Sequence, residues 1–304
     1  MTTPPRRPLK PRMSRRKSLA SAALMLLSAC VMSTASAAQP VAPRAIGVGG
    51  GVTEIVYALG AQDLLVGSDT SSTWPAAALT LPKVGYQRTL AAEGVLSMHP
   101  TVVLASHEAG PPVVLKQIED AGVRVIRVEG DYTFEGLLKR VRLIAAALGR
   151  QQDGEQLAQR LTQQWQDLQA RMRARPAQDT NGRPLRVAFV MTHGGGSMAA
   201  GRGTGADALL RLAGAENAFG KDFDDYKPLS PESLAAAAPD VIIATADRPE
   251  AAEAALASMR TTPGIAQTPA VKHGRVAALD IVLTLGFGPR LPEAVDAVYH
   301  ALLK

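Results

Sequence analysis

Two glutamates, Glu93 and Glu232, stand at the same place in a sequence phrase that occurs twice. In each copy the glutamate opens a short amphipathic stretch, a proline follows seven positions later, and an apolar run typical of a β-strand comes next. A carboxylate in the first turn of a helix is stabilised by the helix dipole, by some tenths of a kcal/mol to about 1 kcal/mol. The repeat predicts two similar α/β lobes with one glutamate each. A cleft between two lobes is a common place for a ligand.

Tyr86 and Arg88 form a second pair of side chains that could act together, because they lie two residues apart. A free tyrosine ionises only near pH 10, so its phenolate needs a stabilising neighbour. On an extended segment Arg88 would lie on the same side as Tyr86 and could supply that hydrogen bond. The same residues also fit a half-buried loop aromatic and a solvated surface charge.

The pattern of apolar runs predicts an α/β lobe in the first half of the chain. We expect strands at 45–48, 64–67, 101–105 and 123–128 and a helix at 112–121. A further helix is expected at 55–59, with Thr53 as its N-cap and Gly60 closing it. Strands that alternate with helices are typical of a parallel sheet.

A long polar helix is expected between the two lobes, because residues 134–175 carry no strand pattern and Gly149 and Gly154 divide two helical runs. Along 152–175 the apolar residues form one stripe, namely Leu157, Leu161, Trp165, Leu168 and Met172. A single linking helix is stiffer than a hinge of several strands, so we expect little closure on binding.

A second α/β block is expected from residue 185 onward. Its predicted elements are a strand at 185–190, a glycine-rich stretch at 194–205, a helix at 206–212, the second copy of the repeat, a strand at 241–245 and a C-terminal helix after Pro292. The fold class is therefore α/β, with two Rossmann-like lobes that have parallel sheets, one long joining helix and a ligand cleft between the lobes. The predicted division is 38–150 for the N-terminal lobe, 151–182 for the linking helix and boundary, and 183–304 for the C-terminal lobe.

Residues 1–37 predict a secretory signal peptide. They contain seven basic residues and no acidic one, then an apolar run at 19–27 and the small-residue site Ala35–Ala37. The apolar run is too short to span a membrane stably. Arg15 and Arg16 hint at twin-arginine export, and Leu27–Cys30 resembles a lipoprotein box in which Cys30 would be lipidated. We favour soluble export to the periplasm, because the cleavage site lies just beyond that cysteine.

Removal of this leader changes the charge of the protein. Without its seven basic residues, 26 basic residues face 27 acidic ones, a net charge of about −1. The basic excess therefore belongs to the leader and does not favour nucleic-acid binding. Cys30 is the single cysteine, so the exported protein would have no disulfide and no cysteine-bound metal. A domain of about 265 residues can bury a sufficient core without them.

Several segments together resemble the periplasmic haemin-binding proteins of bacterial haem-uptake ABC transporters. The segments are Gly49–Gly60, Val84–Arg88, His193–Gly196, Met198–Gly203, Tyr226–Ser230 and Gly286–Arg290. The resemblance covers essentially the whole exported chain. The repeated glutamates alone place the chain in the wider class that also carries cobalamin and ferric siderophores. The segments at 84–88 and 193–196 narrow the expected cargo to haem. It implies a non-enzymatic carrier of ferric haem b that delivers its cargo to a permease dimer with a cytoplasmic ATPase.

The resemblance implies how the iron is held. Tyr86 would be the axial haem ligand, and Arg88 would hydrogen-bond its phenolate. His193 would lie in the cleft of the second lobe, as a second iron ligand, as a ligand of a second haem, or as a hydrogen-bonding partner of the glycine-rich turn. Gly194–Gly196 would let the backbone approach the flat macrocycle.

The resemblance also assigns the rest of the haem pocket. Met198 would pack on the porphyrin face, although an ordinary core methionine fits equally well. Arg202 and Arg290 would meet the haem propionates in the forked geometry of arginine and carboxylate, with Lys227 as a weaker candidate.

Glu93 and Glu232 resemble the docking residues of this transporter class. One glutamate on each lobe would pair with arginines on the two halves of the permease. A permease with two-fold symmetry should meet matching charges on both lobes, which is the reason to prefer docking to a role in helix stability alone.

Other classes of protein fit the sequence less well. An exported hydrolase would need Gly-x-Ser-x-Gly, and the nearest match, Gly195–Ala199, ends in alanine. A nucleotide-binding enzyme would need Gly-x-Gly-x-x-Gly or the P-loop pattern, and the glycine-rich turns match neither. Five histidines without a clustered ligand set do not predict a metal-ion site. The nearest rival is the same class with cobalamin or a ferric siderophore as cargo; siderophore sites use arginines and aromatic residues without a protein–iron bond.

Overall fold

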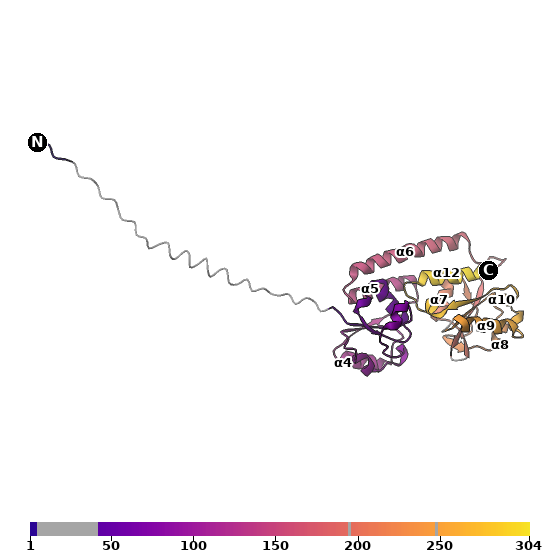
Figure 1. Cartoon of the computed structure of the whole chain (residues 1–304). Coiled ribbons are helices and arrows are strands. Elements are labelled where there is room, and N and C mark those ends of the chain that lie inside the picture. The colour runs from indigo at the N-terminus through magenta and orange to yellow at the C-terminus, as the bar shows by residue number, and fades with distance from the viewer. Residues whose placement is uncertain (5–41, 194–195, 247–248) are drawn as a thin grey trace. The chain divides into compact units, whose positions relative to one another are not determined.

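The computed structural model describes residues 1–4, 42–193, 196–246 and 249–304 (Figure 1). The expected cleavage site and Cys30 lie outside the described residues. Pro43–Lys304 form one compact unit, which holds every helix and strand discussed below. No helix in the described part of the chain is both long enough and apolar enough to cross a membrane.

The first sheet has four parallel strands in the order β2-β1-β3-β4. Its strands are β1 (Ala45–Val48), β2 (Leu65–Ser68), β3 (Val102–Ser106) and β4 (Arg124–Val128). Successive side chains point to opposite faces. One face packs on α2 (Gly50–Ala58) and α5 (Phe134–Ala147), and the other packs on α3 (Ala92–Leu96) and α4 (Pro112–Asp120). The predicted parallel α/β lobe is confirmed.

The second sheet has six strands and is mixed. Five run in the order β10-β9-β5-β6-β8, and β7 pairs with β5. They are β5 (Arg186–His193), β6 (Gly196–Ala200), β7 (Glu216–Asn217), β8 (Tyr226–Pro228), β9 (Val241–Ala246) and β10 (Val276–Asp280). β5, β9 and β10 are parallel, whereas β6 is antiparallel to both β5 and β8.

The strand β6 corrects the sequence interpretation, which placed residues 194–205 in a glycine-rich stretch without a strand. Gly196–Ala200 pairs with the end of β5, and Ala199 and Ala200 are buried. The small residues of this segment pack beside β5. Glycine is unusual inside a strand, so the sequence pattern did not indicate one here.

The second half also contributes most of the remaining helices. They are α7 (Gly205–Leu212), α8 (Pro231–Ala237), α9 (Pro249–Thr261), α10 (Pro269–Lys272), α11 (Ile281–Leu285) and α12 (Leu291–Leu302). Short 3₁₀ turns at Gln62–Leu64, Ala76–Thr80, Gln87–Thr89 and Ile265–Gln267 complete the described elements.

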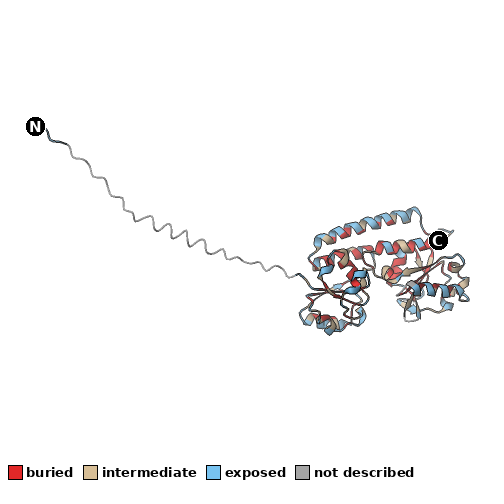
Figure 2. Cartoon of the chain, in the orientation of Figure 1, coloured by how far each residue is buried: buried red, intermediate tan, exposed pale blue. Residues whose placement is uncertain are grey.

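The long helix α6 (Gln151–Ala174) confirms the predicted linking helix. It packs on α5 in the first half and on α12 in the second (Figure 1). Leu157, Leu161, Trp165 and Leu168 form its buried stripe, and the opposite face is exposed (Figure 2). Gly154 does not break the helix. A Cβ there would lie 2.5 Å from Ala145 Cβ, so this glycine permits close packing of α5 and α6.

The two halves share more than α6, which goes beyond the expected single joining helix. Apolar residues of α2, α5 and α6 form one continuous core with residues of β5, α7 and α12. Ile55, Leu137, Leu161, Leu209 and Val298 are members of this shared core. The outer face of each sheet has a separate core of its own.

The start of α2 differs from the prediction. Thr53 is not the N-cap but a buried residue inside the helix, and its Oγ1 lies 2.7 Å from Ser72 Oγ. The helix begins at Gly50 because Gly49, with φ of 105°, makes a turn that an L side chain rarely adopts. Asp69 Oδ1 fixes this turn by accepting a hydrogen bond from Gly49 N at 2.9 Å.

The sequence repeat is also a structural repeat. Glu93 lies in the first turn of α3 and Glu232 in the first turn of α8, and both are exposed. After each helix one residue has positive φ, namely His99 (50°) and Ala238 (43°), and a proline then leads into the strand. The expectation that each glutamate opens a helix is confirmed.

Candidate functional site

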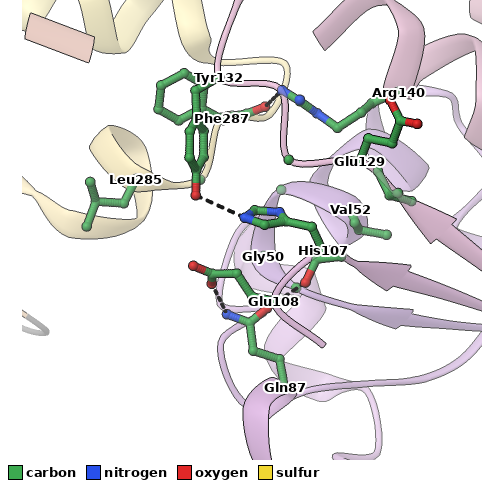
Figure 3. A pocket seen from close by; sticks show the side chains of 16 residues that line it. Gly50, Val52, Gln87, His107, Glu108, Glu129, Tyr132, Arg140, Leu285 and Phe287 are labelled. Atoms are coloured by element: carbon green, nitrogen blue, oxygen red, sulfur yellow. Dashed lines mark hydrogen bonds between the residues drawn. The ribbon is translucent and has the colours of Figure 1, made fainter. Parts of the chain in front are cut away.

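A cleft of about 560 Å³, partly open to solvent, lies where β1, β3 and β4 end and meet the second half of the chain. Its lining includes the start of α2, the residues that follow β3 and β4, and three residues of the second half, Leu285, Gly286 and Phe287 (Figure 3). The carboxyl ends of parallel strands are the usual ligand site of open α/β sheets. The cleft therefore lies where the fold class predicts a ligand.

His107 and Tyr132 form a polar pair inside the cleft. His107 Nε2 lies 3.0 Å from the Tyr132 hydroxyl, and the Tyr132 ring packs on Phe287 with 4.9 Å between centroids (Figure 3). The His107 ring lies against Gly130, where a Cβ would come within 2.5 Å of it. Burial lowers the pKa of His107 and raises the pKa of Tyr132. Both groups are therefore neutral at pH 7, and the pair can offer a hydrogen bond to a ligand.

The lowered pKa of His107 predicts a titration midpoint below 6.5. The folded state binds fewer protons than the unfolded state near pH 6, so this residue's contribution to stability is lost as pH falls below 6.5. Imidazole resonances followed by NMR across pH 4.5–8 would give the midpoint, with His107→Gln to assign them. A midpoint above 6.5 would contradict the burial argument.

A chain of hydrogen bonds ties the loop that carries Tyr86 to the end of β3. Ser106 Oγ donates to Gln87 Oε1 (2.9 Å), and Gln87 Nε2 donates to Glu108 Oε2 (3.1 Å). Arg88 Nη2 donates to the other carboxylate oxygen of Glu108 (2.6 Å). Glu108 thus holds Arg88 in place next to the cleft.

Tyr86 is 45% exposed and directly precedes Gln87, which lines the cleft. The predicted extended segment is only partly correct. Tyr86 itself is extended, but Gln87–Thr89 form a 3₁₀ turn, so strand alternation does not bring Arg88 beside it. Burial lowers the pKa of Arg88, but Glu108 and Tyr86 together outweigh it, so the pKa is raised.

The predicted haem-pocket residues of the second half lie on or near the β6–β8 edge of its sheet. Met198 is on β6 opposite Pro228, and Lys227 is an exposed residue of β8. Arg202 Nε donates to Asp224 Oδ1 at 2.7 Å, and both side chains are exposed. His193 ends β5, and its side chain lies outside the described structure. Met198, Arg202 and Lys227 are not among the described residues that line the cleft.

Arg290 has a partner that the sequence did not indicate. Its Nε and Nη2 donate to the two carboxylate oxygens of Glu54 at 3.1 and 3.2 Å, and its backbone N donates to Glu54 Oε1 at 3.1 Å. Its guanidinium carbon lies 4.3 Å from the centroid of the Trp74 ring. The role of Arg290 as a propionate contact stays a prediction, and Glu54 already occupies two of its side-chain nitrogens.

Sequence reasoning missed most of the residues that line the cleft. His107 and Glu108 directly follow the predicted strand at 101–105, and Tyr132 comes shortly after the one at 123–128. The rule that ligands lie at the carboxyl ends of parallel strands could have found them. Arg140, which donates to the Phe287 carbonyl oxygen at 2.9 Å, carries no such signal because it lies inside a helix.

A metal ion held by protein side chains alone has no clear site in the described residues. No group of three or more His, Cys, Asp or Glu side chains among them is arranged to hold one.

The fold and the cleft define a substrate-binding protein, and the chain belongs to the periplasmic binding protein family, whose model matches residues 46–282. It is 43% identical to the solved periplasmic heme-binding protein BhuT in complex with two hemes, covering 86% of this chain and 97% of that one with a TM-score of 0.77. A periplasmic heme-binding protein from Pseudomonas aeruginosa is 38% identical, with 86% and 93% covered and a TM-score of 0.76. The vitamin B12-binding protein of Pectobacterium atrosepticum is 26% identical over 72% of this chain and 77% of its own length.

Proposed function

We propose that the protein binds ferric haem in the periplasm and delivers it to an inner-membrane ABC permease for haem and iron uptake. The observation that carries the proposal is the 43% identity to a periplasmic heme-binding protein over 86% of this chain. Tyr86 supports it, because it is exposed and lies two residues before Arg88, which pairs with Glu108. A phenolate suits ferric iron, and a neighbouring guanidinium would stabilise its charge. Haem b is the cargo, and the proposal includes no catalytic residue and no catalytic cofactor.

In the proposed complex Tyr86 binds the iron and Arg88, held by Glu108, stabilises the phenolate. His193 and Met198 are the proposed haem contacts from the second half, with Arg202 and Lys227 as the proposed propionate contacts. We assign 38–150 and 183–304 to the two lobes and 151–182 to the linking helix and boundary. The leader 1–37 directs export, with release into the periplasm favoured over a lipid anchor on Cys30.

Cobalamin is the second candidate cargo, because a vitamin B12-binding protein matches 72% of the chain at 26% identity. Parallel titrations with haemin and cobalamin, followed by visible absorption, distinguish the two. We expect saturable binding of haemin, with a high-spin ferric spectrum and a tyrosinate charge-transfer band. Saturation by cobalamin alone would replace haem with a corrinoid as the cargo.

Docking to the permease is expected to depend on the repeated glutamates. The double variant Glu93→Gln/Glu232→Gln should keep its haem affinity, because neither residue lines the cleft. Stimulation of the reconstituted transporter's ATPase should fall about tenfold or more, since interface charge pairs set encounter rate and orientation.

The matched control for docking is Glu135→Gln/Glu250→Gln, which also removes one exposed first-turn glutamate from each half. This variant should stimulate the ATPase like wild type. Equal stimulation by all three proteins would show that Glu93 and Glu232 do not dock the permease.

A further inference from the structure

The segment 286–290 of the second half lies directly against α2 of the first half. Glu54, only 6% exposed in its side chain, accepts three hydrogen bonds from Arg290, whose side chain is 19% exposed. Trp74, from the loop after β2, covers the guanidinium. Arg290 is thus held between a carboxylate and an aromatic ring that both belong to the first half.

Two glycines allow the backbones to approach this closely. A Cβ on Gly51 would overlap the Gly286 carbonyl oxygen, and a Cβ on Gly288 would lie 3.1 Å from Glu54 Cδ. Between them Phe287 is held by the first half as well. Its carbonyl oxygen accepts from Arg140 Nη2 at 2.9 Å, and its ring packs on Tyr132.

The ion pair is suited to fixing geometry more than to adding stability. Burial raises the pKa of Glu54 although Arg290 lowers it, so desolvation outweighs the attraction. Buried ion pairs commonly contribute little net stability for this reason. The planar fork of arginine, by contrast, binds a carboxylate in one orientation, and here the backbone N of Arg290 adds a third fixed point.

We infer that Glu54 and Arg290 form a polar clasp that, with the shared apolar core, fixes the angle between the two lobes before any ligand binds. The clasp lies next to the cleft. The start of α2 lines one side of the cleft, and Leu285–Phe287 line the other. A fixed angle sets the distance between these two walls. The clasp therefore sets the width of the cleft.

The inference is tested by the distance between the lobes in the protein without ligand. The full chain with Cys30→Ser has no other cysteine, so Gln117→Cys on α4 and Ala254→Cys on α9, both exposed, give two unique spin-label sites. Pulsed electron paramagnetic resonance should give one narrow distance distribution. In Glu54→Gln and in Arg290→Gln the distribution should be at least twice as wide or shifted.

The matched control is Glu155→Gln, which breaks the exposed ion pair with Arg142 between α5 and α6 and should leave the distribution narrow. If Glu54→Gln fails to fold, Arg290→Lys gives the same readout, because it keeps the charge beside Glu54 and removes only the fork. Distributions that match wild type in every folded clasp variant would overturn the inference. Because no haem is present, the result is independent of the proposed cargo.

Discussion

Replacing Tyr86 with alanine should lower the affinity for haemin by about 100-fold or more, equivalent to roughly 3 kcal/mol of binding free energy. The physical reason is the loss of the single proposed protein–iron bond. The tyrosinate charge-transfer band should disappear with it. Haemin titration followed by visible absorption measures both effects.

Two further variants test whether the loss of affinity comes from the Tyr86 oxygen. Tyr86→Phe should behave like the alanine variant, because it keeps the ring and removes only the oxygen that binds iron. Tyr132→Phe removes another hydroxyl near the cleft and should keep the charge-transfer band. If Tyr86→Phe binds haemin like wild type, the ligand is His193 or another residue, and the chemistry proposed for Tyr86 is wrong.

The parts of the fold that the sequence predicted are those in which local pattern and tertiary structure agree. The strands β1, β3 and β9 are short apolar runs, each followed by a helix, and α6 has a clear apolar stripe. The two copies of the repeat fold alike because each encodes a complete unit of helix, turn and strand. Such local units need no knowledge of distant residues.

The missed elements depend on contacts that a local pattern does not contain. Thr53 has the chemistry of an N-cap, but the turn at Gly49 and its hydrogen bond to Asp69 start the helix earlier. Gly196–Ala200 becomes a strand because it pairs with β5 on one side and β8 on the other. In both cases tertiary partners decide between local alternatives.

The candidate site also contains residues that the sequence indicated and residues that only tertiary contacts bring together. Tyr86 and Arg88 were identified through a resemblance, and the structure adds Glu108, 20 residues further on, as the group that holds Arg88. Glu54 and Arg290 are 236 residues apart in the chain, so no sequence spacing could have paired them. Their contact joins two of the segments that carry the family resemblance, Gly49–Gly60 and Gly286–Arg290.

The second large effect is expected from a substitution of a glycine at this contact. Gly51→Ala should lower the free energy of unfolding by about 1–3 kcal/mol, because the new Cβ overlaps the Gly286 carbonyl oxygen and backbone must shift to admit it. In α3, a Cβ on Gly94 would have its nearest neighbour, Val84 O, at 3.7 Å. Gly94→Ala should therefore be neutral or stabilise by up to about 1 kcal/mol, as expected for alanine in a helix.

Denaturant unfolding of both variants and of the wild type measures these changes. The comparison distinguishes the effect of steric overlap at the contact from a general effect of adding a methyl group. The spin-label distance between α4 and α9 should also change in Gly51→Ala, because this overlap pushes segment 286–290 away from α2 and pulls Arg290 from Glu54. Gly94→Ala should leave the distance unchanged. If Gly51→Ala unfolds at the wild-type midpoint with the wild-type distance, α2 and segment 286–290 can separate without cost, and their contact does not set the angle between the lobes.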